Sequence, residues 1–393
     1  MRPSESTSPV TRSLHHRVAI DGSAPVVTPL FQNSAFEATS PFFYTRKANP
    51  NSVELEGALA ILEDARHVIS TTTGMSALSL ALGLLAPGAH LVVNRDIYGC
   101  SHELFKRTCD QRGMRLTSLD LSCPEGIAAL PEKVDMVLFE TPTNPFLRTI
   151  SIQAVAGAVR RKSPEALVVV DNTWATPLFQ KPLQHGASIS LGSATKFLSG
   201  HSDVMGGYLC VDDEALAERL GTERFYHGAI LDPHSAWMLR RSLQTFPLRM
   251  REHVRVTEHM RHFLARRAEI VEVQFPDVDG DQLQNYGGIV FVKLRADLVS
   301  RYREFTDALT LFDTGTGMAC VTSMVAQPWT GSHASMSAAD KEAIGLGPDL
   351  VRLCFGLEDV ADLERDLERA FEEIEHEEPR RSVPVAPGRV PTA

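Results

Sequence analysis

Short apolar runs recur through the middle of the chain with helix-like segments between them, and this alternation constrains the fold most strongly. The runs cover residues 90–94, 136–140, 167–170, 187–191 and 207–211. Several are continuously apolar, which is typical of parallel strands that are covered on both faces. Helix-like segments at 101–112 and 152–161 would supply the crossovers between them. The sequence therefore predicts an α/β fold with a mainly parallel sheet.

Polar residues follow these runs at the positions where the strands end. Tyr98 comes after the first run, Asn144 after the second and Asp171 after the third. Lys196 follows the fourth run. Ligands of such sheets gather at the carboxyl ends of the strands. An aromatic ring, an amide, a carboxylate and a lysine are therefore predicted to converge on one rim.

Lys196 has unusual neighbours for a surface lysine. Small and hydroxyl residues precede it, and Phe197 and Leu198 follow it. A partly buried ammonium is costly unless it is neutralised or used, and a Schiff base with a carbonyl cofactor does both. Ser193 and Thr195 offer hydroxyl donors to a phosphate. The alternative is a lysine that caps a helix near a strand end, and this stretch alone leaves both interpretations open.

A second stretch has the local geometry of a phosphate site. Residues 67–70 predict a short strand, Gly74 stands in the following turn, and an apolar helix is predicted over 77–85. In such a unit the backbone N–H groups and the helix dipole hold a phosphate. The stretch is neither a Walker loop nor GxGxxG, so Gly74 equally fits a position of tight packing. Arg46, in a polar loop upstream, suits either a bidentate anion contact or a solvated loop.

Composition excludes several classes of function. The 393 residues are 43% hydrophobic and carry a net charge of -10, so no basic field would attract nucleic acid or a membrane surface. The longest apolar stretch, 77–86, is too short to span a bilayer. The six cysteines contain no CxxC pair, so we expect buried free thiols in a reducing, cytoplasmic setting.

One histidine pair raises the question of a metal ion. His259 and His262 are spaced i, i+3 on a predicted helix, which would suit two ligands of one ion. A solvated helix face is the favoured interpretation, and we expect no metal site.

The chain divides into four predicted regions. They are an N-terminal arm over 1–52, a large α/β domain over 53–250, a second α/β domain over 251–376 and a disordered tail over 377–393. The arm is expected to be extended over residues 1–30, and Asn51 or Ser52 is expected to cap a helix over 53–65. In the second domain Arg352 alternates with apolar residues on a strand, and an inward arginine requires an anion.

Together these residues resemble the cysteine/methionine-metabolism family of pyridoxal-phosphate (PLP) enzymes. The family includes cystathionine γ-synthase, cystathionine γ- and β-lyases, methionine γ-lyase and O-acylhomoserine sulfhydrylases. The resemblance runs from about residue 29 to 370. It rests on Tyr44-Thr45-Arg46, Thr73-Gly74-Met75, Tyr98-Gly99, Glu140-Thr141-Pro142-Thr143-Asn144-Pro145, Val170-Asp171-Asn172-Thr173, Ser193-Ala194-Thr195-Lys196 and Arg352-Leu353.

The resemblance implies an aspartate-aminotransferase-like fold (fold type I), with PLP bound by the large domain and a smaller C-terminal α/β domain. It implies that Lys196 forms the Schiff base and later moves protons. Asp171 would pair with the pyridine nitrogen of PLP, and Tyr98 would stack on the ring and assist proton transfer.

The remaining site residues are also assigned by resemblance. The N–H groups of Gly74 and Met75 and the hydroxyls of Ser193 and Thr195 would hold the phosphate. Asn144 would lie near the cofactor's phenolic oxygen and the substrate carboxylate, which Arg352 would clamp. Tyr44 and Arg46 would reach the phosphate from the neighbouring subunit, with Tyr44 also near the substrate. This implies a catalytic dimer, usually paired into a homotetramer.

Two places depart from the family pattern. Gly317-Met318-Ala319-Cys320, within the unusual run 313–320, stands where a Ser-Leu-Gly-Gly-like segment is usual. Gln327 stands where a histidine is common. Cys100 follows Tyr98-Gly99, where methionine γ-lyases also carry cysteine, and a small buried thiol is the favoured interpretation. Because the 313–320 loop lines the substrate side in the family, recognition of the substrate side chain is expected to be altered.

The resemblance implies γ-elimination or γ-replacement on an L-amino acid with a γ-leaving group. The substrate class is cystathionine, methionine or homocysteine, an O-acylhomoserine, or a specialised compound such as a γ-halogenated amino acid. The alternative is β-elimination of the cystathionine β-lyase type. A non-catalytic role is disfavoured because Lys196, Asp171, Tyr98 and Arg352 are all present.

Overall fold

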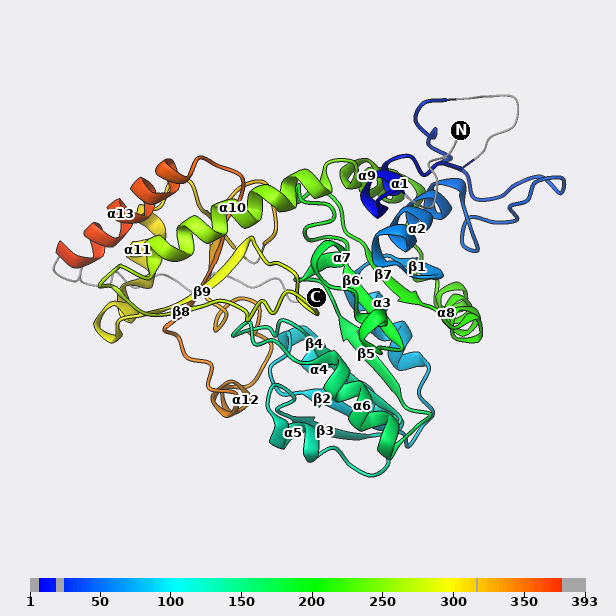
Figure 1. Cartoon of the computed structure of the whole chain (residues 1–393), viewed down its shortest axis with the longest axis horizontal. Coiled ribbons are helices and arrows are strands. Elements are labelled where there is room, and N and C mark those ends of the chain that lie inside the picture. Colours follow the sequence, from blue (N-terminus) through cyan, green and yellow to red (C-terminus); the bar gives the residue numbers. More distant parts are fainter. Residues whose placement is uncertain (1–6, 19–24, 316, 377–393) are drawn as a thin grey trace, which may run out of the picture.

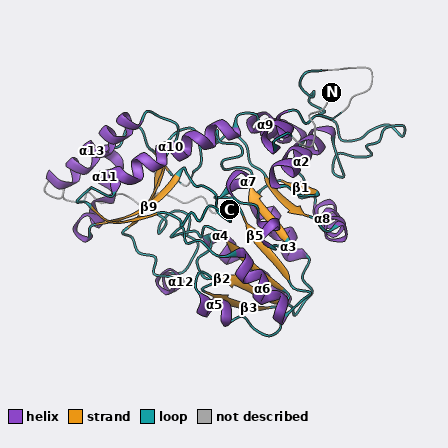
Figure 2. Ribbon diagram, in the orientation of Figure 1, coloured by secondary structure: helices purple, strands orange, loops and turns teal. Residues whose placement is uncertain are grey.

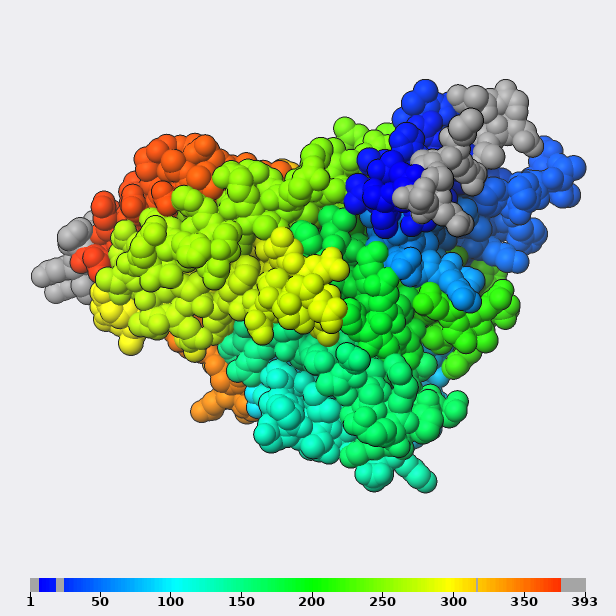
Figure 3. All heavy atoms as spheres, in the orientation of Figure 1, coloured from blue at the N-terminus to red at the C-terminus, as the bar shows by residue number. Residues whose placement is uncertain are grey.

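The computed structural model describes residues 7–18, 25–315 and 317–376. Figures 1 and 2 show two sheets in two lobes, with helices packed over both, and Figure 3 shows the C-terminal lobe, yellow to red, beside the larger one. The predicted disordered tail, 377–393, lies outside the described residues.

The larger sheet has seven strands among the described residues, and four of its six pairings are parallel. In sheet order they are β1 (His67–Thr71), β7 (Gly207–Val211), β6 (Ile189–Ser193), β5 (Leu167–Asp171), β4 (Met136–Glu140), β2 (His90–Asn94) and β3 (Arg115–Leu119). β7 runs antiparallel to both neighbours. The predicted mainly parallel sheet is confirmed, whereas β3 escaped prediction because it is a half-exposed edge strand with few apolar residues.

Helices cover both faces of this sheet. They are α2 (Pro50–Glu63), α3 (Gly74–Gly83), α4 (Gly99–Arg112), α5 (Pro124–Ala128), α6 (Ile152–Lys162), α7 (Thr176–Phe179) and α8 (Glu214–His227), with the 3-10 turn η1 (Pro182–His185). Leu138 belongs to the core cluster shared with α3 and α4, and its neighbour Val137 belongs to the cluster shared with α6. Burial on both faces explains why β4 is apolar throughout.

The smaller sheet is mostly antiparallel, in the order β10 (Asp313–Thr314), β11 (Met324–Ala326), β12 (Leu350–Cys354), β9 (Ile289–Leu294) and β8 (Ile270–Gln274). Its helices are α10 (Phe246–Leu264), η2 (Ala296–Arg301), α11 (Tyr302–Ala308), α12 (Ala338–Ala343) and α13 (Val360–His376), and α9 (Pro233–Leu243) precedes them. Met250 of α10 packs in a core with the large domain, and Met260 packs in the core of the small one. The predicted boundary at residue 250 therefore falls inside a helix that belongs to both lobes.

Two predictions about the N-terminal region were wrong in detail. Residues 1–30 are not extended throughout, because α1 (Pro9–Leu14) forms a short helix against α2. The helix predicted over 53–65 begins at Pro50, with Asn49 as its cap. The Asn49 side chain accepts from the Asn51 N–H at 3.0 Å, and the Asn49 N–H donates to Ser52 Oγ at 3.2 Å. This reciprocal capping box fixes the start of the helix three residues earlier than expected.

Within the described residues, no helix combines the length and apolarity that a bilayer crossing requires.

Candidate active site

A cavity of about 680 Å³ opens at the carboxyl ends of β2, β4, β5 and β6. Eight of the predicted site residues line it: Gly74, Met75, Tyr98, Asn144, Asp171, Ser193, Thr195 and Lys196. The prediction that Tyr98, Asn144, Asp171 and Lys196 converge on one rim of the sheet is therefore confirmed for their positions. The cavity also contains side chains from the second domain, among them Met318.

Lys196 lies three residues after the end of β6, half-buried in the cavity wall. Burial, and next the positive charge of Arg352, lower the pKa of its amine. The loop that carries it is held by buried Arg249, which donates to the carbonyl oxygens of Phe197 at 2.7 Å and Leu198 at 3.1 Å. An amine that gives up its proton more readily than an ordinary lysine, on a fixed loop, suits both nucleophilic attack and proton transfer.

Two carboxyl groups lie side by side on the rim. Asp171 ends β5, Glu140 ends β4, and the two residues are paired in the sheet. The Asp171 carboxylate accepts from the Thr173 N–H at 2.9 Å, while Glu140 accepts from the Tyr98 N–H at 3.1 Å. Burial raises the pKa of Asp171, and burial together with the charge of Asp171 raises that of Glu140 well above its ordinary value. Sequence reasoning assigned no role to Glu140, although it begins one of the motifs.

The start of α3 and the end of β6 form a cradle for an anion. Thr73 caps α3 by accepting from the Ser76 N–H at 3.0 Å, so the helix begins at Gly74 rather than at the expected residue 77. A Cβ atom on Gly74 would lie 2.9 Å from Cβ of Ser193. Gly74 therefore brings the helix terminus and a hydroxyl together, which is the arrangement that phosphate groups occupy. This cradle, beside a half-buried lysine and a strand-end carboxylate, fits the donor set that PLP requires.

Tyr98 stands at the N-cap position of α4, makes no side-chain capping hydrogen bond and lines the cavity. Burial raises the pKa of its phenol above the ordinary value, with contributions from Cys100 and Glu140. Cys100 is half-buried rather than buried and lines the same cavity. The phenol thus keeps its proton at neutral pH and can donate a hydrogen bond.

Asn144 and Arg352 approach the cavity from two domains. Asn144 Oδ1 is buried and has no hydrogen-bond partner among the described residues. The buried Arg352 lies on β12 and donates to the carbonyl oxygen of Gly317 at 2.9 Å. Arg352 is not a wall residue of the cavity, but Met318 beside its guanidinium is, at 3.9 Å from Arg352 Nη1 to Sδ.

Tyr44 and Arg46 do not join this group within one chain. They line a separate cavity of about 410 Å³. There the Arg46 guanidinium lies 4.4 Å from the ring centre of Phe225 and 5.7 Å from that of Tyr44. Their predicted contribution from a neighbouring subunit stays a prediction.

The atypical loop, residues 313–320, contacts Arg352 through Gly317 and lines the cavity through Met318. A Cβ atom on Gly317 would lie 2.7 Å from Sδ of Met324, so this glycine makes room for a methionine of β11. Gln327 donates to the carbonyl oxygen of Pro348 at 2.5 Å. Thr316, within the predicted run, lies outside the described residues.

The predicted histidine pair lies on the surface of α10. His259 Nε2 is 2.7 Å from Glu364, and His262 Nδ1 is 2.9 Å from the carbonyl oxygen of Glu258. Each ring thus has its own protein partner, as on a solvated face.

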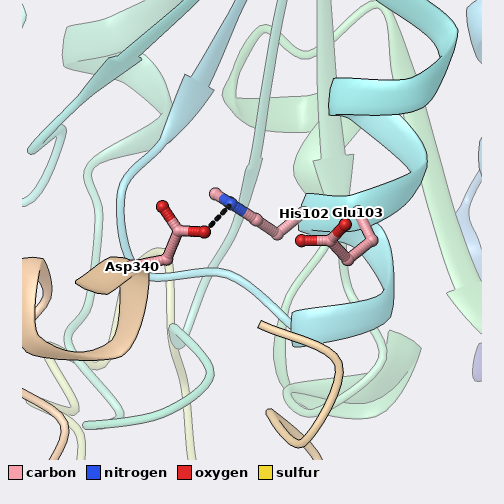
Figure 4. A group of neighbouring side chains, drawn as sticks. All are labelled: His102, Glu103 and Asp340. Carbon is pink, nitrogen blue, oxygen red and sulfur yellow. Dashed lines mark ion pairs between the residues drawn. The ribbon is translucent and has the colours of Figure 1, made fainter. Parts of the chain in front are cut away.

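A different group gathers between α4 and α12 (Figure 4). Ligand atoms of His102, Glu103 and Asp340 lie within 4.8 Å of one another, with 3.8 Å between His102 Nε2 and Asp340 Oδ2. Lys106 Nζ lies 3.2 Å from the same aspartate oxygen, so a cation of the protein already neutralises this carboxylate. We assign no metal to the group.

Comparisons with known proteins identify the family of the chain. The family model for Cys/Met metabolism PLP-dependent enzymes matches residues 11–372. Cystathionine beta-lyase from Lactococcus lactis subsp. cremoris is 30% identical, covering 93% of this chain and 99% of that protein. Cystathionine gamma-synthase from Mycobacterium bovis is 33% identical, covering 93% and 97%. The structure of cystathionine gamma synthase from Xanthomonas oryzae pv. oryzae, in complex with aminoacrylate and cysteine, superposes with a TM-score of 0.90 at 32% identity, covering 94% of this chain and 99% of that one.

The chain belongs to the Cys/Met metabolism PLP-dependent enzyme family. The predicted family and fold are confirmed, and the protein is a PLP-dependent enzyme.

Proposed function

We propose that the protein catalyses γ-elimination or γ-replacement on an L-amino acid with a γ-leaving group. The observation that carries the proposal is the single cavity that joins Lys196, Tyr98 and Asp171 to the Gly74 cradle. The substrate class is cystathionine, methionine or homocysteine, an O-acylhomoserine, or a specialised γ-substituted amino acid.

Binding of the substrate is assigned to three groups. Arg352 would clamp the α-carboxylate, since a guanidinium offers two parallel N–H donors to a carboxylate. The buried Oδ1 of Asn144, without a partner among the described residues, would be satisfied by the cofactor or substrate. The cradle at Gly74 and Ser193 would hold the cofactor phosphate, and Asp171 would pair with its ring nitrogen.

PLP, when bound, supplies an electron-withdrawing ring that accepts charge from the substrate carbon atoms. Lys196 Nζ, as the free amine, would take the Cα proton. Once it has given that proton up, the same amine would take a Cβ proton. Its lowered pKa favours the neutral amine that this role requires. Tyr98, which keeps its phenolic proton at neutral pH, would donate a hydrogen bond to the departing γ-group.

β-Elimination is the second candidate, supported by the similarity to cystathionine beta-lyase from Lactococcus lactis subsp. cremoris. It needs the same lysine and carboxylate clamp but no transfer of a Cβ proton. The products separate the two: β-elimination of cystathionine gives pyruvate, and γ-elimination gives a four-carbon 2-oxo acid.

We further infer a catalytic dimer, paired into a homotetramer, in which Tyr44 and Arg46 complete the site of the neighbouring subunit. The separate cavity that holds both residues within one chain supports this arrangement. A reducing, cytoplasmic location fits the six cysteines, all of which are free thiols.

The test begins with the visible spectrum of the purified protein. It would then be mixed with L-cystathionine, L-methionine, L-homocysteine, O-acyl-L-homoserines and a γ-chloro amino acid, with product masses recorded. Ammonia and a four-carbon oxo acid from a γ-substituted substrate would support γ-elimination, and a new thioether in the presence of a thiol would support γ-replacement. Pyruvate from cystathionine would favour β-elimination instead, and a colourless protein that takes up no PLP would overturn the proposal.

A further inference from the structure

One histidine of the second domain reaches into the first beside the active site. His333 lies between β11 and α12, and its side chain is fully buried. Its Nε2 lies 3.2 Å from the carbonyl oxygen of Ile97 and 3.3 Å from that of Asn144. Ile97 immediately precedes Tyr98, so one imidazole contacts two loops that present site residues.

The hydrogen bonds fix the state of this ring. Both partners of Nε2 are carbonyl oxygens, which only accept, so Nε2 carries the hydrogen. Nδ1 therefore accepts from the Ser332 hydroxyl at 2.9 Å. Burial lowers the pKa of His333 to about 4, so the ring stays neutral at physiological pH. The imidazole is a permanent donor to the two loops rather than a titrating group.

The segment around His333 forms part of the cavity wall. Gly331, Ser332, Ala334 and Ser335 all line the cavity. A Cβ atom on Gly99 would lie 2.7 Å from the Ser332 carbonyl oxygen and 2.8 Å from Cα of His333. The wall thus rests directly on the first turn of α4, at the residue after Tyr98.

Two further contacts fix the residues that flank this segment on either side. Lys341 donates to the carbonyl oxygen of Trp329 at 2.9 Å, and Asp340 of α12 pairs with Lys106 of α4 at 3.2 Å. Figure 1 shows α12, in orange, carried away from its own sheet to lie near the large domain. The backbone of Ser332 and His333 packs against Gly99, but of the hydrogen bonds and ion pair named above, only those of the His333 ring reach Ile97 and Asn144.

We propose that His333 is a positioning residue that sets the placement of Tyr98 and Asn144 relative to the cavity wall formed by residues 331–335. The ring acts through backbone carbonyl groups, so it is not itself a catalytic residue. Its loss would let the two loops and the wall shift independently, and sub-ångström shifts of this kind lower turnover more than they weaken binding.

The test compares two substitutions of His333 by polar side chains that differ in length. His333→Gln can place an N–H near the position of Nε2, whereas His333→Asn is too short to do so. We expect H333Q to keep turnover per bound cofactor within about threefold of the wild type and H333N to lose about tenfold or more, mainly in kcat rather than KM. Equal turnover in H333N and H333Q would overturn the proposal.

A second readout needs neither cofactor nor substrate. Backbone hydrogen exchange should be faster in H333N than in H333Q for peptides covering 95–101 and 142–148, where the two carbonyl contacts lie. Equal exchange in these peptides would overturn the proposal. The turnover measurement rests on the proposed function, whereas the hydrogen-exchange measurement does not. A wild-type protein without activity would therefore count against the proposed function and not against the role of His333.

His90 provides the matched control. It is also buried, with Nδ1 2.9 Å from the carbonyl oxygen of Lys133 and Nε2 2.8 Å from Thr117 Oγ1, but it lies at the amino end of β2, away from the rim. We expect His90→Asn to lower thermal stability without changing kcat or exchange in the two peptides. If H333N does not fold, Ser332→Ala removes only the hydroxyl at Nδ1; faster exchange there supports the proposal, and unchanged exchange contradicts it.

Discussion

The two sheets contribute to the site in opposite ways. The larger sheet places its functional groups at strand ends, where Asp171 and Glu140 are the last residues of buried apolar strands. The smaller sheet contributes Arg352 from the middle of a buried strand and the cavity wall from a long connection. A parallel sheet thus forms its part of the site by topology, whereas the antiparallel sheet does so through individual side chains and loops.

The largest expected effect tests the rim of the larger sheet. Lys196→Ala should lower kcat about 1,000-fold or more, because both the covalent anchor and the proton-transfer amine are lost. The yellow absorbance of the internal Schiff base should disappear even if PLP still binds. Turnover and the visible spectrum of the variant are the measurements, and an active, still-yellow variant would contradict the role of this lysine.

The next largest effect concerns a buried carboxyl beneath the same sheet. Glu63 accepts from the Tyr208 hydroxyl at 2.9 Å and from Ser190 at 3.3 Å, and burial raises its pKa from 4.5 to about 7. Between these values the folded protein holds a proton that the unfolded chain releases. Stability from this group is therefore present below pH 4.5 and is lost as the pH rises through 7, by on the order of 3 kcal/mol.

Glu63→Gln isolates this contribution, because a glutamine still accepts from Tyr208 but does not titrate. Urea unfolding at pH 5 and pH 8 should show a smaller loss of stability in E63Q than in the wild type. The same pH dependence in both proteins would exclude Glu63 as its source. Glu140 and Asp171 also have raised pKa values, and the comparison cancels their contribution.

The smaller sheet is tested by Arg352→Lys. A lysine keeps the charge but loses the two parallel donors, so we expect KM for the amino acid to rise about tenfold to a hundredfold, with a smaller change in kcat. Steady-state kinetics with the best γ-substrate would measure this. Arg369, on the outer face of α13, provides a control, since Arg369→Lys should leave KM unchanged.

The smallest effect concerns the cradle. Gly74→Ala would place its methyl group 2.9 Å from Cβ of Ser193, so the helix terminus must shift away. We expect PLP affinity to fall about tenfold, since the N–H groups no longer converge on the phosphate. Equilibrium titration of the apoprotein with PLP measures this. Gly221→Ala in α8, where a methyl group meets nothing within 4 Å, should leave the affinity unchanged.

Sequence reasoning was most successful where a residue's place in the cavity follows from its position on one strand or turn. Tyr98, Asn144, Asp171 and Lys196 were placed correctly because each follows a buried strand of the larger sheet. Prediction was poorer where local capping decides a boundary, as at Asn49 and Thr73, since several adjacent polar residues can serve as caps.

The amino-acid sequence by itself determined the α/β alternation, the order of polar residues along the rim and the membership of the family. These properties depend on local periodicity and on motifs that lie within a few residues of one another. Only the tertiary structure decided that Glu140 stands beside Asp171, that Arg352 donates to Gly317, and that His333 joins the loops of Tyr98 and Asn144. Such contacts join segments far apart in the chain, and those of His333 also depend on how the two domains dock. Neither kind of contact leaves a periodic pattern in the sequence.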